Sequence, residues 1–97
     1  MHYAIICIDK PDSMELRQAT RPAHVAYLDD YRDQMVAAGP TLTDDGEGMT
    51  GSILIMEFGN KAYAEAFAAG DPYNQAGLFE SVTIKAWRKV FPPDSAE

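Results

Sequence analysis

The chain has 97 residues, with 8 Lys or Arg against 15 Asp or Glu, so its formal net charge is −7. This length suits one domain and is too short for two. The apolar fraction of 46% and the charged fraction of 24% are those of an ordinary globular protein. The acidic balance argues against a nucleic-acid partner, because binding to phosphates draws on clustered Lys and Arg.

The cysteine and histidine content and the hydropathy exclude further kinds of site and protein. The single cysteine, Cys7, excludes an internal disulfide and a zinc site built on several cysteines. His2 and His24 lie far apart without metal-ligand spacing, so we expect no metal site. The longest apolar run, residues 4–8, is far shorter than the roughly 20 residues of a membrane span, and no signal peptide is visible. We therefore expect a cytoplasmic protein without a membrane partner.

The chain begins with a predicted strand and a short helix. Residues 3–8 form a β-rich run that is apolar on both faces, which is typical of a central strand. A helix over residues 14–19 is expected next, because Asp12 or Ser13 can cap its first turn.

A longer helix is expected over residues 22–38. Pro22 suits a first helical turn, where its missing N–H costs nothing, and Gly39 is a typical residue after a helix end. One side of this helix carries side chains at helical spacing, namely Val25, Leu28, Arg32, Met35 and Val36. These residues are expected to form its buried stripe.

The middle of the chain predicts a hairpin and a second helix. A weak edge strand over residues 41–43, a turn over residues 44–48 and a strand over residues 51–58 follow one another. Asn60 can then cap a helix that runs through Ala69.

The last part of the chain predicts a short helix and a long strand. Asp71 followed by proline reads as a cap that begins a short helix ending at Ala76. A strand over residues 79–90 closes the chain's regular structure. We expect one domain over residues 1–91 and a short flexible tail over residues 92–97.

The element order is β-α-β-β-α-β, which predicts a ferredoxin-like α+β fold with an antiparallel sheet and its helices on one face. The strands over residues 3–8 and 51–58 are nevertheless apolar on both sides. An exposed apolar sheet face of several hundred Å² is rare in a monomer. We therefore expect two copies to pair through this open face as a homodimeric α/β barrel.

His24 and Asp71 are the candidate acid–base residues. His24 is expected in the first helical turn at the edge of the buried face, where the helix dipole disfavours an imidazolium. Asp71 is expected to be a helix cap, and its carboxylate could orient an imidazole ring. The alternative for His24 is a packed histidine with one hydrogen bond. The two residues lie far apart in sequence, so spacing alone does not establish their contact.

Three further residues are candidates for substrate contacts. Arg21 could bind an anion or pair with an acidic side chain. Ser52 offers a hydroxyl but lacks the surroundings of a nucleophilic serine. Tyr73 could contact a ligand or belong to the packing. Cys7 is expected to be buried and inert.

Four segments together resemble the YCII-related (YciI-like) family: Arg21-Pro22-Ala23-His24, Gly51-Ser52, Gly70-Asp71-Pro72-Tyr73 and residues 82–91. The resemblance implies a ferredoxin-like fold that pairs as a dimeric α/β barrel. It also implies a His–Asp pair in a pocket beside the sheet, here His24 and Asp71, with Arg21 and Ser52 as neighbours. One chemistry of such relatives is dehydrochlorination of a chlorinated hydroxyquinol, without a metal or an organic cofactor.

The resulting hypothesis is a cofactor-independent, lyase-like enzyme with a small-molecule substrate. His24 is the general base, Asp71 orients it, and Arg21 holds an anion. The main alternative is a non-catalytic module that binds or senses a small ligand in the same pocket. A structural accessory protein and a haem-handling protein are further alternatives. The substrate itself is not predicted.

Overall fold

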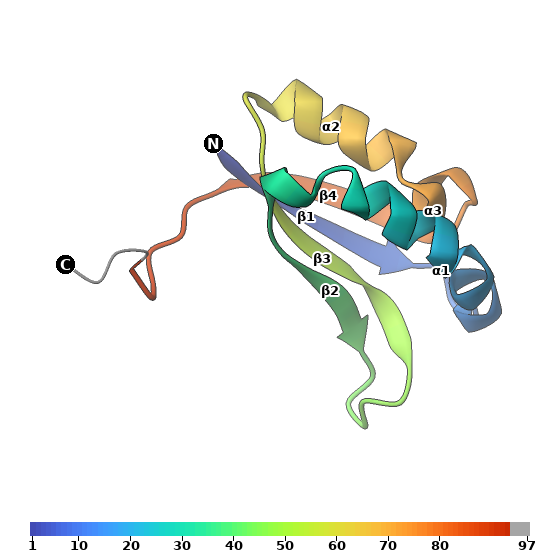
Figure 1. The fold of residues 1–97 in the computed structure, drawn as a ribbon. Coiled ribbons are helices and arrows are strands. Elements are labelled where there is room, and N and C mark those ends of the chain that lie inside the picture. Colours follow the sequence, from blue (N-terminus) through green and yellow to red (C-terminus); the bar gives the residue numbers. More distant parts are fainter. Residues whose placement is uncertain (94–97) are drawn as a thin grey trace.

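In the computed structural model, which describes residues 1–93, a four-stranded antiparallel sheet carries three α-helices over one of its faces (Figure 1). The elements in chain order are β1 (His2–Asp9), α1 (Met14–Asp29), a 3₁₀ turn (Arg32–Gln34), β2 (Met35–Leu42), β3 (Met49–Glu57), α2 (Lys61–Gly70), α3 (Pro72–Gln75) and β4 (Phe79–Trp87). The strand order is β2-β3-β1-β4. The predicted ferredoxin-like α+β fold is confirmed.

The hydrophobic core lies between the sheet and its helices. Alternate side chains of the central strand β1 point toward the helices, and Ile5 faces Leu54 of β3 on one side and Ile84 of β4 on the other. Phe67 of α2 packs against this layer. Every second residue of a strand shares a face, so this register directs the remaining β1 side chains to the opposite face of the sheet.

The opposite face of the sheet keeps exposed apolar side chains. Ile8 is 50% exposed, Ile53 is 43% exposed, and Trp87 at the end of β4 is 36% exposed. Ile53 lies opposite Ile6 in the β1–β3 register. The two-sided apolar character expected from the sequence is therefore present, and the pairing of two copies through this face stays a prediction.

The expected helix boundaries in the first half of the chain are wrong. One helix, α1, replaces the two helices predicted over residues 14–19 and 22–38, and Pro22 lies inside it. Proline removes one hydrogen bond from a helix interior, but buried side chains on both sides of Pro22 hold this helix together. The helix ends at Asp29, before the last residues of the expected stripe.

The end of the expected stripe belongs to a strand. Residues 35–42 form β2, whereas the prediction was a strand over residues 41–43 only. These residues form a strand despite their helical spacing, because they pair with the edge of β3 that β1 does not occupy. Val25 and Val36, both expected to be buried, are 45% and 48% exposed.

The second half of the chain follows the prediction more closely. Asn60 caps α2 by accepting the backbone N–H of Tyr63 at 3.1 Å. The last strand ends at Trp87, earlier than the expected residue 90. Of the predicted tail over residues 92–97, residues 94–97 lie outside the described part of the chain. No helix within residues 1–93 is long and apolar enough to cross a membrane, and the cytoplasmic location stays a prediction.

Gly51 is a position where the sheet tolerates no side chain. A Cβ atom there would overlap the backbone carbonyl oxygen of Cys7 in β1. We expect Gly51→Ala to lower the free energy of unfolding by about 1–3 kcal/mol in urea titrations, as overpacking does. Gly39 in β2 is the matched control, because a Cβ there would meet no atom within 4 Å. Equal stabilities of the Gly51→Ala and Gly39→Ala proteins would contradict this prediction.

Candidate active site

His24 and Asp71 meet in the structure although 47 positions separate them. His24 lies on the buried side of α1, and Asp71 is the N-cap residue of α3. The Nδ1 atom of His24 lies 2.8 Å from Oδ1 of Asp71, which is a hydrogen-bond distance. The same oxygen accepts the backbone N–H of Tyr73 at 2.9 Å. Asp71 is thus both a helix cap and the partner of the imidazole ring.

This contact defines the tautomer of the neutral His24 ring. A carboxylate can only accept hydrogen bonds, so Nδ1 of His24 donates its hydrogen to Asp71. Nε2 then carries the lone pair that can take a proton. His24 lies in the middle of α1 and not in its first turn. The prediction that the helix dipole disfavours an imidazolium at this position is therefore wrong. The neighbouring Asp71 is the charge that acts on the ring.

The Tyr73 ring lies against His24 and Arg17. The His24 and Tyr73 ring centroids are 3.9 Å apart, with 16° between the planes. The guanidinium carbon of Arg17 lies 4.6 Å from the Tyr73 centroid, within the range of a cation–π contact. Burial raises the pKa of the Tyr73 phenol, although the positive charges of Arg17 and Arg21 act to lower it. The phenol is therefore protonated at neutral pH.

Arg17 is held rigidly by two partners from the sheet. Its Nε and Nη2 atoms donate to the two carboxylate oxygens of Asp9 at 2.7 and 3.0 Å, and Nη2 also donates to Ser52 Oγ at 2.9 Å. Arg17 is only 3% exposed. Burial acts to lower the pKa of Arg17, but the hydrogen bond and charge of Asp9 outweigh it and raise the pKa. Arg17 is thus a fixed positive charge next to Tyr73.

A cavity of about 200 Å³ opens beside these groups, between α1, α3 and the edge strand β2. Its polar lining comes from Arg17, Arg21, His24 and Tyr73, and its apolar lining includes Val25 and Leu28. Since a cavity of about 150 Å³ holds benzene, this volume suits one substituted ring. Within residues 1–93, no three His, Cys, Asp or Glu side chains are placed to hold a metal ion.

The five predicted site residues do not all reach this cavity. His24, Tyr73 and the exposed Arg21 line it. Asp71 does not line the cavity and is hydrogen-bonded to His24. Ser52 is buried, and its hydroxyl oxygen accepts from Arg17, which lines the cavity. The roles of these residues in binding or catalysis stay predictions.

The sequence analysis missed Arg17 and its partner Asp9. Arg17 and His24 are seven positions apart, so on one continuous helix they lie two turns apart on the same face. A break placed at Pro22 assigned them to different helices and hid this relation. The signal in the sequence was the seven-residue spacing of Arg17 and His24, taken as part of one helix that continues through Pro22.

Cys7 lies in β1 opposite Ser52, close to the charged groups of the site. Burial, together with the negative charges of Asp71 and Asp9, raises the pKa of its thiol from 9.0 to about 12. We expect the folded protein at pH 8 to resist iodoacetamide, because the thiolate is the reactive form. Mass spectrometry should show alkylation only after urea is added. Rapid labelling of the folded protein would contradict this assignment.

The same shift predicts how stability depends on alkaline pH. Because the thiol loses its proton more readily in the unfolded chain, the free energy of unfolding should fall as the pH rises from about 9 toward 12. Well below pH 9 the thiol is protonated in both states and contributes no pH dependence. Urea titrations between pH 8 and pH 10.5 should show a steeper loss for the wild type than for Cys7→Ala. Parallel curves for the two proteins would contradict the prediction.

Comparison with known proteins agrees with this description. The family model for the YCII-related domain matches residues 1–88 of this chain. Protein YciI of Escherichia coli O6:H1 is 42% identical over 98 residues, which cover 94% of this chain and 100% of that protein. A Haemophilus influenzae protein is 38% identical with the same coverage of both chains. The resemblance predicted from the sequence is confirmed.

A solved structure is similar over nearly the whole chain. It is 5-chloro-2-hydroxyhydroquinone dehydrochlorinase (TftG) from Burkholderia phenoliruptrix AC1100, in complex with 2,5-dihydroxybenzoquinone. The TM-score is 0.85 at 35% sequence identity, covering 91% of this chain and 94% of TftG.

Proposed function

This chain belongs to the YCII-related family, and from that premise we propose that it is a cofactor-independent enzyme of the lyase class, with His24 as its general base. The observation that supports this proposal best is the 2.8 Å contact between His24 Nδ1 and Asp71 Oδ1 beside a cavity of about 200 Å³. The likeness to TftG supports an elimination as the reaction type. The proposed substrate is a single chlorinated ring with an acidic O–H or C–H group.

The chemistry follows from the orientation of the imidazole. Asp71 binds Nδ1–H, so Nε2 is the nitrogen that takes a proton from the substrate. In the substrate tautomer whose chlorine-bearing carbon is tetrahedral, the electron pair left behind forms a new double bond, and chloride departs with the electrons of its bond to that carbon. The products are the substrate less HCl, and the proton rests on His24. Asp71 stabilises the imidazolium, and a positioned base contributes about 10²–10⁴ in rate.

The other site residues take supporting roles in this proposal. Arg21 lies at the cavity with an exposed side chain and binds a phenolate or carboxylate of the substrate. Tyr73 is a wall of the cavity and contacts the ring of the substrate. Ser52, predicted to contact the substrate, acts through Arg17, because its hydroxyl is bound to that side chain.

We further propose that the enzyme is a homodimer through the open face of its sheet. Ile8, Ile53 and Trp87 expose apolar surface there, and burying such surface drives association. Sedimentation equilibrium tests this pairing directly. Replacing Ile53 by Asp should give a folded monomer, whereas a monomeric wild type would contradict the pairing.

The second candidate is a module that binds a small ligand in the same cavity without turnover. The buried His24–Asp71 pair could equally form a fixed hydrogen-bonding wall for a ligand.

Two measurements separate the enzyme from the binding module. The first follows chloride release from 5-chloro-2-hydroxyhydroquinone with a chloride electrode, and the second follows binding of 2,5-dihydroxybenzoquinone by calorimetry. An elimination enzyme for this ring class releases chloride faster than the uncatalysed reaction and in proportion to protein concentration. Binding without chloride release favours the module. If the protein neither binds the quinone nor releases chloride, a site for hydroxylated single rings is contradicted.

A further inference from the structure

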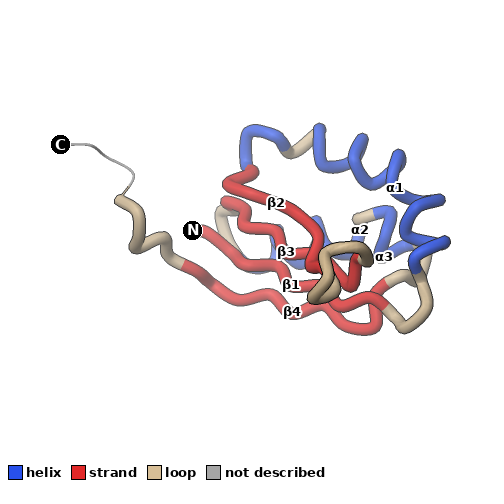
Figure 2. Tube along the Cα trace, turned by 90° about the horizontal axis from the view of Figure 1, so that it is seen from below, coloured by secondary structure: helices blue, strands red, loops and turns tan. Residues whose placement is uncertain are grey.

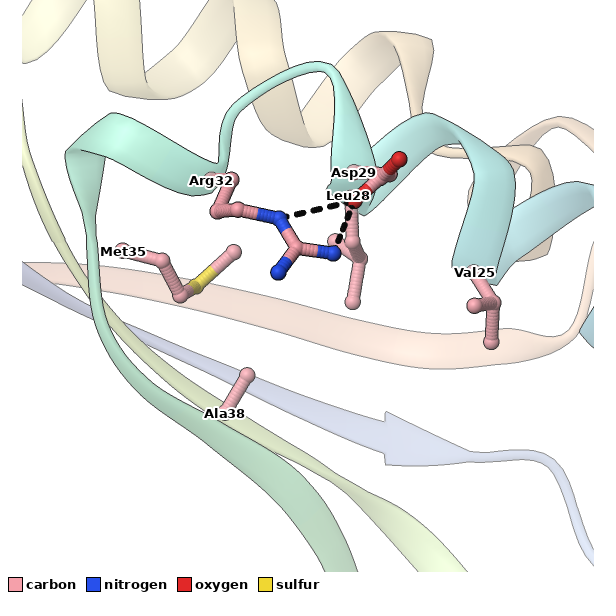
Figure 3. Close-up of a pocket in the computed structure, with 6 residues that line it drawn as sticks. All are labelled: Val25, Leu28, Asp29, Arg32, Met35 and Ala38. Atoms are coloured by element: carbon pink, nitrogen blue, oxygen red, sulfur yellow. Dashed lines mark hydrogen bonds and ion pairs between the residues drawn. The ribbon is translucent and has the colours of Figure 1, made fainter.

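A second apolar groove adjoins the cavity of the candidate site. Its walls are Val25 and Leu28 from α1 and Met35 and Ala38 from β2, whose side chains face the same space in Figure 3. Val25, Leu28 and Ala38 also line the cavity beside His24. The groove and the cavity therefore share walls, and an occupant of the groove would lie next to the cavity.

The segment next to this groove, residues 29–33, carries three acidic side chains and one basic one. Asp29 lines the groove and is bonded to Arg32, as the dashed lines of Figure 3 show. Asp33 is near enough to Arg32 to raise the pKa of its guanidinium, together with Asp29, and Asp30 follows directly in sequence. A segment with both apolar and basic side chains would complement this surface.

The chain itself contains such a segment. Residues 88–93, which we call the C-terminal arm, follow β4 and extend away from the body of the molecule in both views (Figures 1 and 2). Val90 and Phe91 in the arm are each 78% exposed. Arg88 and Lys89 precede them, so two of the eight basic residues of an acidic chain stand beside two exposed apolar ones.

The arm and the groove lie at the same end of the sheet but at opposite edges. Trp87, the last residue of β4, lies opposite His2 at the start of β1, and His2 lies opposite Glu57 of β3. Met35 at the start of β2 lies opposite Met56, next to Glu57. The edge strands are β4 and β2, so an arm at one edge is separated from the groove at the other edge.

A twofold axis parallel to the strands can bring the arm of one copy close to the groove of another. When such an axis passes over the centre of the open sheet face, it preserves strand direction and height and reverses the order of the strands, so β4 of one copy lies over β2 of the other in antiparallel orientation. It also brings the arm level with the groove. Phe91 is the fourth residue after Trp87, so an extended arm carries it about 13 Å from the end of β4, which exceeds the roughly 10 Å between packed layers. The arm is therefore long enough to enter the groove of a neighbouring copy.

We propose that the C-terminal arm of one copy lies in the groove of a second copy, with Phe91 against Leu28 and Met35, and that this exchange is reciprocal. Arg88 then lies near the acidic segment over residues 29–33. Because the groove and the cavity share walls, the partner's arm lies next to the site that contains His24. This second step rests on the proposed function, whereas the exchange itself does not.

The test of the exchange is a disulfide between two different chains. One full-length chain carries Phe91→Cys and the other carries Val25→Cys, and the two are mixed and oxidised. The buried Cys7 is present in both and provides its own control in the wild type. The expected result is a mixed disulfide that forms about 100-fold faster than for unassociated chains, since the effective concentration in a complex reaches millimolar.

A matched control uses Tyr63→Cys in place of Val25→Cys. Tyr63 lies on α2, is 62% exposed and lines a different, aromatic pocket with Tyr31 and Phe58. Phe91→Cys should react slowly with it. Faster reaction with Tyr63→Cys than with Val25→Cys, or equally slow reaction with both, would overturn the proposed exchange.

A second measurement separates the arm from the function. Phe91→Ala should weaken dimerisation about 30-fold in sedimentation equilibrium, as loss of a central aromatic anchor does, while Tyr63→Ala should not. If the cross-link forms but the wild type releases no chloride, the arm exchange stands and the elimination activity fails. If chloride release persists without the cross-link and is unchanged in Phe91→Ala, the activity stands and the exchange fails.

Discussion

Replacement of His24 by Ala or Gln is expected to lower kcat for the elimination by about 10²–10⁴-fold, the contribution of a positioned general base. His24→Gln is the sharper variant, because its amide can still donate to Asp71 but cannot take a proton. Near-ultraviolet circular dichroism and the melting temperature should remain close to those of the wild type for His24→Gln. Initial rates of chloride release measure the effect.

The control for this experiment is the other histidine of the chain. His2 lies at the start of β1, away from the cavity, and its ring makes an edge-to-face contact with Trp87. His2→Ala should therefore leave kcat unchanged. Asp71→Asn keeps an acceptor for the N–H of Tyr73 but loses the charge that stabilises the imidazolium. It should lower kcat and move the pH profile of kcat/KM. Full activity of His24→Gln would eliminate the proposed base.

Features that depend on neighbouring residues were predictable from the sequence. The caps at Asn60 and Asp71 are side-chain contacts to a backbone N–H two or three residues away, so residue type and position suffice to predict them. The ferredoxin-like order of elements followed from periodicity. The extent of α1 and β2 did not, because tertiary contacts decided it: helix packing carried α1 through Pro22, and pairing with β3 made residues 35–38 a strand.

The candidate site shows the same division. His24 and Asp71 are 47 positions apart; their residue types suggested an acid–base pair and the resemblance to a family supported it, but only the structure places them in contact. Arg17 and Asp9 were missed for a different reason. A buried ion pair is invisible to an analysis that expects charged residues at the surface, and the helix break assigned to Pro22 removed the spacing that relates Arg17 to His24.

Loss of the Arg17–Asp9 pair is expected to have the largest effect on stability. Both side chains are almost fully buried, at 3% and 6% exposure, and their two hydrogen bonds form a bidentate contact. Arg17→Met removes the cation and leaves the Asp9 carboxylate buried without it. Breaking a buried pair in this way costs about 3–5 kcal/mol. In a domain of this size the melting temperature should fall by about 15 °C or more.

The exposed pair of Arg32 and Asp29 provides the matched control, since their side chains are 81% and 59% exposed. Arg32→Met should leave the melting temperature near the wild-type value, because exposed ion pairs contribute little. The double variant Arg17→Met, Asp9→Leu tests the mechanism. If the cost of Arg17→Met comes from an uncompensated buried charge, removing that charge should restore part of the lost stability. Equal stabilities of the single and double variants would show that Arg17 acts through its packing on Tyr73 and its hydrogen bond to Ser52, and would contradict the electrostatic explanation.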